Sequence, residues 1–91
     1  MLPAKLLNDM DDKAKEIGLI IGIPNTIYCY TVSRHSIAYM ELYNNQWVVW
    51  RETYQVGRRK AISYKTIAQS NTFDYALLQF KKYIDYLLKK S

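Results

Sequence analysis

Apolar residues near the start of the chain recur at helical spacing. They are Leu6, Met10, Ala14 and Ile17. Steps of three and four residues place such positions on one side of a helix. Pro3 suits a first helical turn because its missing N–H would have no partner there, and Gly18 stands where glycine commonly ends a helix. The pattern therefore predicts a helix from about Pro3 to Ile17.

A second apolar stripe, with steps of four, three, four and three, runs through the C-terminal part of the chain. It consists of Phe73, Leu77, Phe80, Ile84 and Leu87. Asn71 or Thr72 can cap this segment by accepting a hydrogen bond from a backbone N–H of the first turn. Asp74 near its start and Lys89 and Lys90 near its end match the helix dipole. We therefore expect a C-terminal helix.

Between these helices lie runs rich in aromatic and β-branched residues, which are typical of strands. The runs cover Ile27 to Val32, Ser36 to Tyr43, Gln46 to about Tyr54, and Lys60 to Lys65. The preceding stretch, up to Asn25, contains Gly22 and Pro24 and is interpreted as a connection. Asn44-Asn45 joins two runs, and asparagine tolerates the positive φ of a type I′ hairpin turn.

The order of these segments predicts an α+β fold. We expect an N-terminal helix, a three- or four-stranded antiparallel meander sheet, and a C-terminal helix packed on one face of the sheet. A chain of 91 residues is small enough to share one core. Residues 1–91 are therefore interpreted as a single α+β domain.

The register of the predicted hairpin separates two sheet faces, because directly opposed residues point to the same side. The apolar face carries Ala38, Met40, Leu42, Trp47 and Val49. The other face carries Tyr39, Glu41, Tyr43, Val48 and Trp50. If both helices pack on the apolar face, the second face is left facing water. The alternative is that the first helix covers it, or that its rings only form cross-strand pairs.

Composition restricts the cellular setting. The longest apolar run, Ile17 to Ile23, is far shorter than the ~20 residues that span a bilayer, so we expect no membrane contact. Asp9, Asp11 and Asp12 stand where a signal peptide would be apolar. The single cysteine allows no internal disulfide. These features predict a cytoplasmic protein.

Patterns that would indicate catalysis are missing from the sequence. Cys29 and His35 are the only residues of their types, and strand alternation gives no reason to bring them together. We interpret Cys29 as a small buried hydrophobe and His35 as a turn residue. Glu41 and Glu52 share a face, but a small sheet offers little concavity around such a pair. We expect no enzyme, no catalytic residues, no metal and no cofactor.

The net charge is +5, and residues 51–91 hold nine Lys or Arg against three acids. A basic half suggests an acidic partner or a nucleic acid, although simple solvation of an exposed surface is the alternative. The basic residues near one turn are Arg51, Arg58, Arg59, Lys60 and Lys65. Because Trp50 and Tyr64 lie beside them, stacking and charge together can hold single-stranded nucleic acid.

The order of elements also matches that of the double-stranded RNA-binding domain. That domain grips phosphates with lysines at the start of its second helix. The corresponding positions here are Thr72, Phe73 and Asp74. The order therefore matches and the motif does not, so a nucleic-acid-binding module is the second hypothesis.

The second half of the chain resembles the small immunity proteins of bacterial polymorphic toxin systems, in particular the family called immunity protein 59. The residues behind this resemblance are Gln46-Trp-Val-Val-Trp-Arg-Glu52, Gly57-Arg-Arg-Lys60, Ile62-Ser-Tyr-Lys65, and the last helix with Ala76, Leu77 and Phe80. The family pattern has a more acidic entry to the last helix than Asp74 alone provides. The resemblance implies a protein that binds and neutralises one cognate toxin.

These observations lead to one main functional hypothesis, an immunity or inhibitor protein that acts by protein–protein contact. The predicted partner-binding residues are Tyr39, Glu41, Tyr43, Trp50, Arg51, Arg58 and Arg59. Because the chain is basic, its partner is expected to have an acidic surface. A phage-borne inhibitor is another possibility. A third is a subunit that only self-associates through its open face or its sheet edge. The chain is therefore expected to be a monomer or a homodimer.

Overall fold

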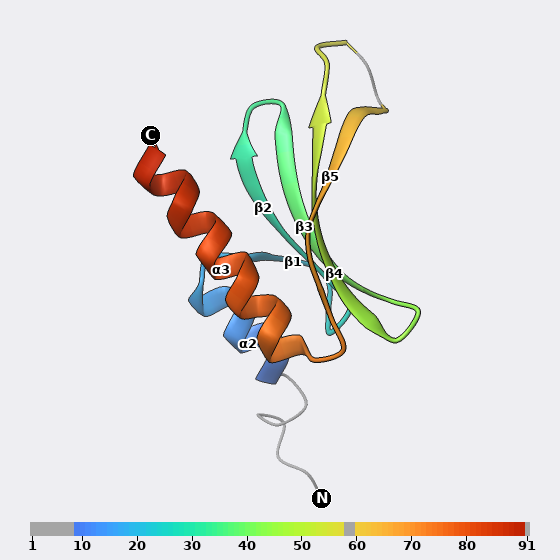
Figure 1. The fold of residues 1–91 in the computed structure, drawn as a ribbon, viewed down its shortest axis with the longest axis vertical. Coiled ribbons are helices and arrows are strands. Elements are labelled where there is room, and N and C mark those ends of the chain that lie inside the picture. The colour runs from blue at the N-terminus through green and yellow to red at the C-terminus, as the bar shows by residue number, and fades with distance from the viewer. Residues whose placement is uncertain (1–8, 58–59, 91) are drawn as a thin grey trace, which may run out of the picture.

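The computed structural model describes residues 9–57 and 60–90. Its elements are α2 (Asp9–Glu16), β1 (Ile20–Ile23), β2 (Ile27–Ser33), β3 (Ser36–Tyr43), β4 (Gln46–Tyr54), β5 (Ala61–Ser70) and α3 (Phe73–Lys90), as Figure 1 shows. The strands form one antiparallel sheet in the order β1-β2-β3-β4-β5. The α+β prediction is confirmed, but the described residues contain five strands instead of three or four.

α2 ends where the sequence predicts. Gly18 has a φ of 94°, and its N–H donates to the carbonyl of Lys15 at 3.0 Å. Glycine adopts this conformation without the steric cost that a side chain would bring. The residues from 3 to 8, which were also expected to be helical, lie outside the described part of the chain.

The additional strand is β1, which lies in the stretch before Asn25 that was predicted to be a connection. That interpretation is wrong, because Ile20 and Ile21 pair with Cys29 and Tyr28 of β2. The register shifts between Ile21 and Ile23, so the irregularity falls at Gly22. Glycine is common at such irregularities in edge strands. Its presence made a short edge strand look like a loop.

The β3–β4 hairpin has the predicted turn and register. Asn44 and Asn45 have φ values of 50° and 62°, as a type I′ turn requires. Tyr39 lies opposite Trp50 across the two strands. β5 continues to Ser70, beyond the predicted end at Lys65, and its pairing with β4 shifts register twice.

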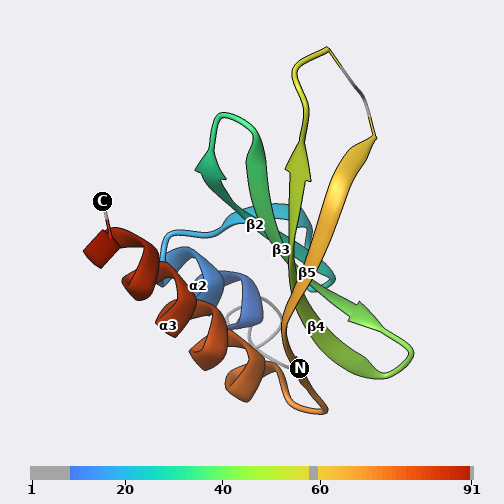
Figure 2. The ribbon, with the colours of Figure 1, turned by 45° about the horizontal axis from the view of Figure 1, so that its top comes forward.

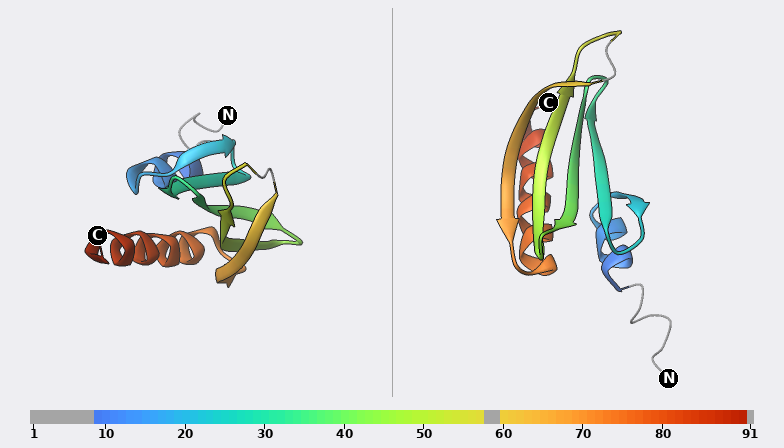
Figure 3. Two further views of the ribbon diagram at one scale, coloured as in Figure 1. Left: turned by 90° about the horizontal axis from the view of Figure 1, so that it is seen from above. Right: turned by 90° about the vertical axis from the view of Figure 1, so that its right-hand side faces the viewer.

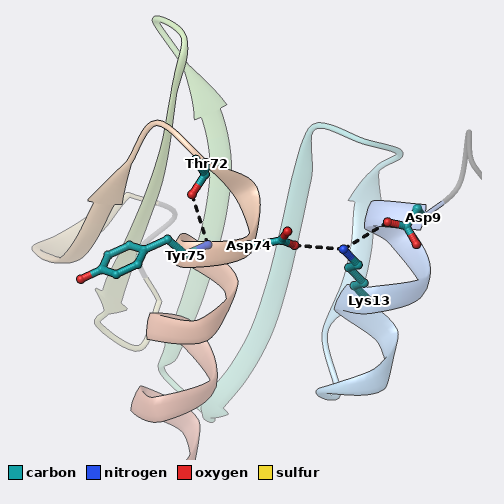
Figure 4. Close-up of polar contacts among 5 residues, drawn as sticks. All are labelled: Asp9, Lys13, Thr72, Asp74 and Tyr75. Atoms are coloured by element: carbon teal, nitrogen blue, oxygen red, sulfur yellow. Dashed lines mark hydrogen bonds and ion pairs between the residues drawn. The ribbon is translucent and has the colours of Figure 1, made fainter.

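Thr72 caps α3. Its side-chain oxygen accepts the N–H of Tyr75 at 3.4 Å, and Asp74 occupies the first turn. Lys13 of α2 pairs with Asp74 of α3 at 3.1 Å and with Asp9 at 3.2 Å, which links the two helices (Figure 4). The predicted cap and the predicted helix are both confirmed.

Both helices lie on the same side of the sheet (Figures 2 and 3). The buried apolar residues form one cluster of Ala14, Leu19, Tyr28, Ala38, Met40, Trp47, Val49, Ala76, Leu77, Phe80 and Ile84. This cluster joins α2, α3 and four of the five residues predicted for the apolar face of the sheet. The fifth, Leu42, is 43% exposed, because it stands next to the Asn44-Asn45 turn at the end of the hairpin. The alternative in which the first helix covers the second face is therefore wrong for α2.

A buried carboxylate attaches α2 to the sheet. Asp11 accepts a hydrogen bond of 2.6 Å from the Tyr28 hydroxyl and one of 2.9 Å from the Asn25 N–H. Burial raises the pKa of Tyr28, and the hydrogen bond to Asp11 raises this pKa further. The phenol therefore stays protonated and keeps its donor.

Within residues 9–57 and 60–90, neither helix combines the length and the apolar character needed to cross a membrane.

Candidate protein-binding face

The sheet face opposite the helices carries a concentration of aromatic residues. Register and alternation place there Cys29, Tyr39, Glu41, Tyr43, Val48, Trp50, Glu52, Tyr54 and Tyr64, which we call the aromatic face. None of these residues is fully buried. Tyr43 is 63% exposed and Tyr64 is 68% exposed. Neither helix in the described part of the chain covers this face (Figure 3).

Trp50 and Tyr39 form a stacked pair at the centre of the aromatic face. Their ring centroids are 5.2 Å apart and their planes differ by 22°. They come from directly opposed positions of β3 and β4, so the hairpin register sets this contact. Such aromatic pairs add about 0.5–1.5 kcal/mol beyond the area they bury. The pair is therefore held in place before any partner arrives.

Glu52 accepts hydrogen bonds from the side chains around this pair. Its Oε1 accepts the Trp50 indole N–H at 3.2 Å, and its Oε2 accepts a short hydrogen bond from the Tyr54 hydroxyl. The Tyr54 and Tyr39 hydroxyls lie 3.4 Å apart. The hydrogen bond to the carboxylate is the main reason that the pKa of Tyr54 is raised. The face therefore has an ordered polar centre.

Glu41 is the second carboxylate on the aromatic face. It is partly buried and lies between Ile27 of β2 and Val48 of β4 in the cross-strand row. The ion pairs found among the described residues involve neither Glu41 nor Glu52. Both carboxylates therefore sit among apolar and aromatic neighbours with no positive charge paired to them there.

Arg51 lies on the helix-covered side, away from the predicted aromatic anchors. Its Nε donates to Ser36 Oγ at 2.5 Å, and one of its terminal nitrogens donates to the Tyr83 hydroxyl of α3 at 2.8 Å. Lys65 opposes Arg51 on β5 and so shares its face. The bond to Tyr83 connects β4 to α3, and the bond to Ser36 connects β4 to β3.

The predicted site is thus divided by the structure. Tyr39, Glu41, Tyr43 and Trp50 lie together on the aromatic face. Arg51 lies on the other side of the sheet. The predicted contacts at positions 58 and 59 lie outside the described residues. The sequence predicts a grouping of Trp50 with Arg51 and Lys65 around one turn. In the structure Trp50 lies on one face of the sheet, and Arg51 and Lys65 lie on the other.

Tyr54 is not among the site residues predicted from the sequence, and Tyr64 is predicted only as a neighbour of the basic residues. Continuing the β4 alternation from Trp50 through Glu52 reaches Tyr54, so that residue was within reach of the pattern. Tyr64 was not, because the register between β4 and β5 shifts between Thr53 and Tyr54, on the way from the turn to Tyr64. A bulge of this kind reverses the alternation and leaves no mark in the sequence.

Cys29 and His35 carry the thiol and the imidazole that could take part in catalysis. Cys29 is partly buried beside Tyr39, and its burial raises the pKa of the thiol. His35 is exposed in the turn between β2 and β3, as expected. The described residues enclose no pocket and contain no group of three or more His, Cys, Asp or Glu side chains placed to hold a metal ion.

Comparison with models of known protein families, with curated proteins and with solved structures finds no match to this chain.

Proposed function

We propose that the aromatic face docks onto a protein partner and that the chain acts as a cytoplasmic inhibitor of the immunity type, which neutralises a cognate toxin by contact. The observation that carries the proposal is the uncovered sheet face centred on the Trp50–Tyr39 stack. The resemblance of the second half to immunity proteins suggests which kind of partner to seek. The surface itself supports the more general part, binding to a protein.

The residue types on this face are those that dominate protein interfaces. Tyrosine and tryptophan are enriched among the few residues that supply most of the binding energy. Here Trp50 is already held by its stacking on Tyr39 and by its hydrogen bond to Glu52. A side chain fixed before binding loses less conformational entropy when the complex forms. Trp50 is therefore the expected anchor.

The distribution of charge favours a protein over a nucleic acid. Single-strand binding combines stacking rings with cations that follow the phosphates. On this chain the rings lie on the aromatic face with Glu41 and Glu52, whereas Arg51 and Lys65 lie on the opposite face. Phosphates brought to the rings would therefore meet carboxylates. The net charge of +5 still attracts an acidic partner over long range.

Partner capture from nuclease-treated extract of the source cells at moderate salt tests the proposal. Tyr43→Ala and Tyr75→Ala form a matched pair, because Tyr43 is 63% exposed on the aromatic face and Tyr75 is 53% exposed on α3. We expect one stoichiometric protein that binds the wild type and Tyr75→Ala and is lost from Tyr43→Ala. The captured protein should also have a toxic activity that the wild-type chain suppresses.

Three results would contradict the proposal. The first is capture that is equally strong with Tyr43→Ala. The second is recovery of nucleic acid that vanishes with nuclease or salt. The third is a homodimer in sedimentation equilibrium that Tyr43→Ala dissociates, because the face would then be occupied by a second copy.

A further inference from the structure

Charge on the sheet is divided between its faces. Within the described strands the basic residues are Arg51 and Lys65, and they oppose each other on the helix-covered face. The aromatic face has two carboxylates, Glu41 and Glu52, and no strand cation. Side chains at successive strand positions point to opposite faces of a sheet. Neither of these two cations therefore lies on the face that carries the two carboxylates.

The Glu52 carboxylate is oriented by hydrogen bonds, but within residues 9–57 and 60–90 no cation pairs with it. Both of its donors, the Trp50 indole and the Tyr54 hydroxyl, are neutral. Ion pairs among the described residues leave Glu52 without a cation. A partner that covered this carboxylate with apolar atoms would bury an unpaired charge, which is strongly unfavourable. A partner that docks here must therefore bring a positive charge to Glu52.

Arginine fits this position better than lysine. Each oxygen of Glu52 accepts one hydrogen bond from the chain, and a carboxylate oxygen has a second lone pair. The planar guanidinium can donate to both oxygens at once and can also stack on an aromatic ring. The Trp50–Tyr39 pair lies beside the carboxylate and offers such a ring surface.

We propose that the aromatic face receives an arginine side chain of the protein partner, with its guanidinium paired to Glu52 and packed against the Trp50–Tyr39 rings. The inference rests on the proposed function and specifies the chemistry of the partner's surface. The partner surface as a whole is acidic enough to be attracted by the basic chain, and it carries one arginine within an apolar patch. Glu41 adds negative potential to the same face.

A peptide titration followed by NMR tests the pairing without the natural partner. The probes are acetyl-Gly-Arg-Gly-amide and the same peptide with citrulline, which has the shape of arginine and no charge. The observed signals are the indole N–H resonances, with that of Trp50 assigned by its absence from Trp50→Phe. We expect the arginine peptide to shift the Trp50 signal in a saturable way and the citrulline peptide to bind about tenfold or more weakly, equivalent to about 1.4 kcal/mol.

Variants identify the carboxylate that is responsible. Glu52→Gln keeps an oxygen for the Trp50 indole and removes the charge, so it should weaken arginine-peptide binding about tenfold. Asp85→Asn, at an exposed carboxylate on α3, should leave binding unchanged. An unmoved Trp47 signal shows that each variant is folded. Since the citrulline comparison uses the wild type, it does not depend on any variant.

Equal binding of the two peptides, or full binding by Glu52→Gln, would overturn the inference. So would a short oligothymidylate that shifts the Trp50 signal at moderate salt, because phosphates would then occupy the face. The capture experiment distinguishes a failure of the arginine pairing from a failure of the proposed function. A partner lost from Tyr43→Ala but retained by Glu52→Gln would sink the arginine pairing and leave the docking face standing.

Discussion

Replacing Trp47 and Trp50 by alanine, one at a time, compares the two sheet faces within a single strand. Trp47 is 5% exposed and packs against Phe73, with ring centroids 5.1 Å apart, and against Tyr28 at 6.3 Å. Truncating a buried tryptophan typically lowers the unfolding free energy by about 3–5 kcal/mol. That is a large part of the ~5–15 kcal/mol that stabilises a natural domain.

Trp50 should matter much less for folding. Its truncation removes one stacked pair, worth about 0.5–1.5 kcal/mol, and one hydrogen bond of similar net value. We therefore expect Trp50→Ala to lower the unfolding free energy by about 1–2 kcal/mol. Urea denaturation followed by circular dichroism measures both variants. With a slope of about 1 kcal/mol per M for a small domain, their midpoints should differ by about 2 M.

Equal destabilisation by the two replacements would refute the assignment of the faces. It would mean that Trp50 is packed as tightly as Trp47, and hence that the aromatic face is covered. A change in the slope for Trp50→Ala alone would indicate altered compactness instead of a simple loss of contacts. The comparison therefore tests the packing argument independently of any partner.

Three smaller predictions concern individual side chains. Thr72→Ala removes the α3 cap and should lower the unfolding free energy in urea by about 1 kcal/mol, and no change would show that the cap is dispensable. Hydrogen bonds to Asp74 and then Asp9 raise the pKa of Lys13 above 10.5, so its stabilising effect is present at neutral pH and is lost as pH rises through that raised pKa. The difference in melting temperature between wild type and Lys13→Met should therefore shrink as pH rises through that raised pKa, and a constant difference would contradict this. Because burial raises the pKa of Cys29, iodoacetamide should alkylate it more slowly in the folded chain than in urea at about pH 8, and equal rates would contradict the burial.

The central hairpin could be predicted from sequence because its turn residues and the alternation of its strands indicated the same register. Asn44-Asn45 specified the turn, the turn specified the register, and the register placed Tyr39 beside Trp50. The end of the first helix at Gly18 and the whole of α3 could also be predicted, since in each case the apolar stripe and the end residues indicated the same boundary. The register left Tyr39, Tyr43 and Trp50 on one face of the sheet. The structure shows that both helices lie on the other face, so these residues are uncovered.

The edges of the sheet were harder to predict for a physical reason. β1 contains Gly22, and β5 pairs through two register shifts, so neither strand keeps a simple alternation. Edge strands tolerate such irregularities because only one of their sides is paired. Arg51 was grouped with Trp50 because the two are adjacent in sequence, although adjacent strand residues point to opposite faces.

Titration calorimetry of the captured partner with purified variants tests most directly whether the aromatic face is the binding surface. Trp50→Ala should weaken binding by about 30- to 700-fold, which corresponds to the ~2–4 kcal/mol expected for a central aromatic anchor. Tyr75→Ala, on the opposite side of the molecule, should change the affinity less than about threefold. Unchanged affinity of Trp50→Ala, or an equal loss in Tyr75→Ala, would contradict the claim that the aromatic face is the binding surface.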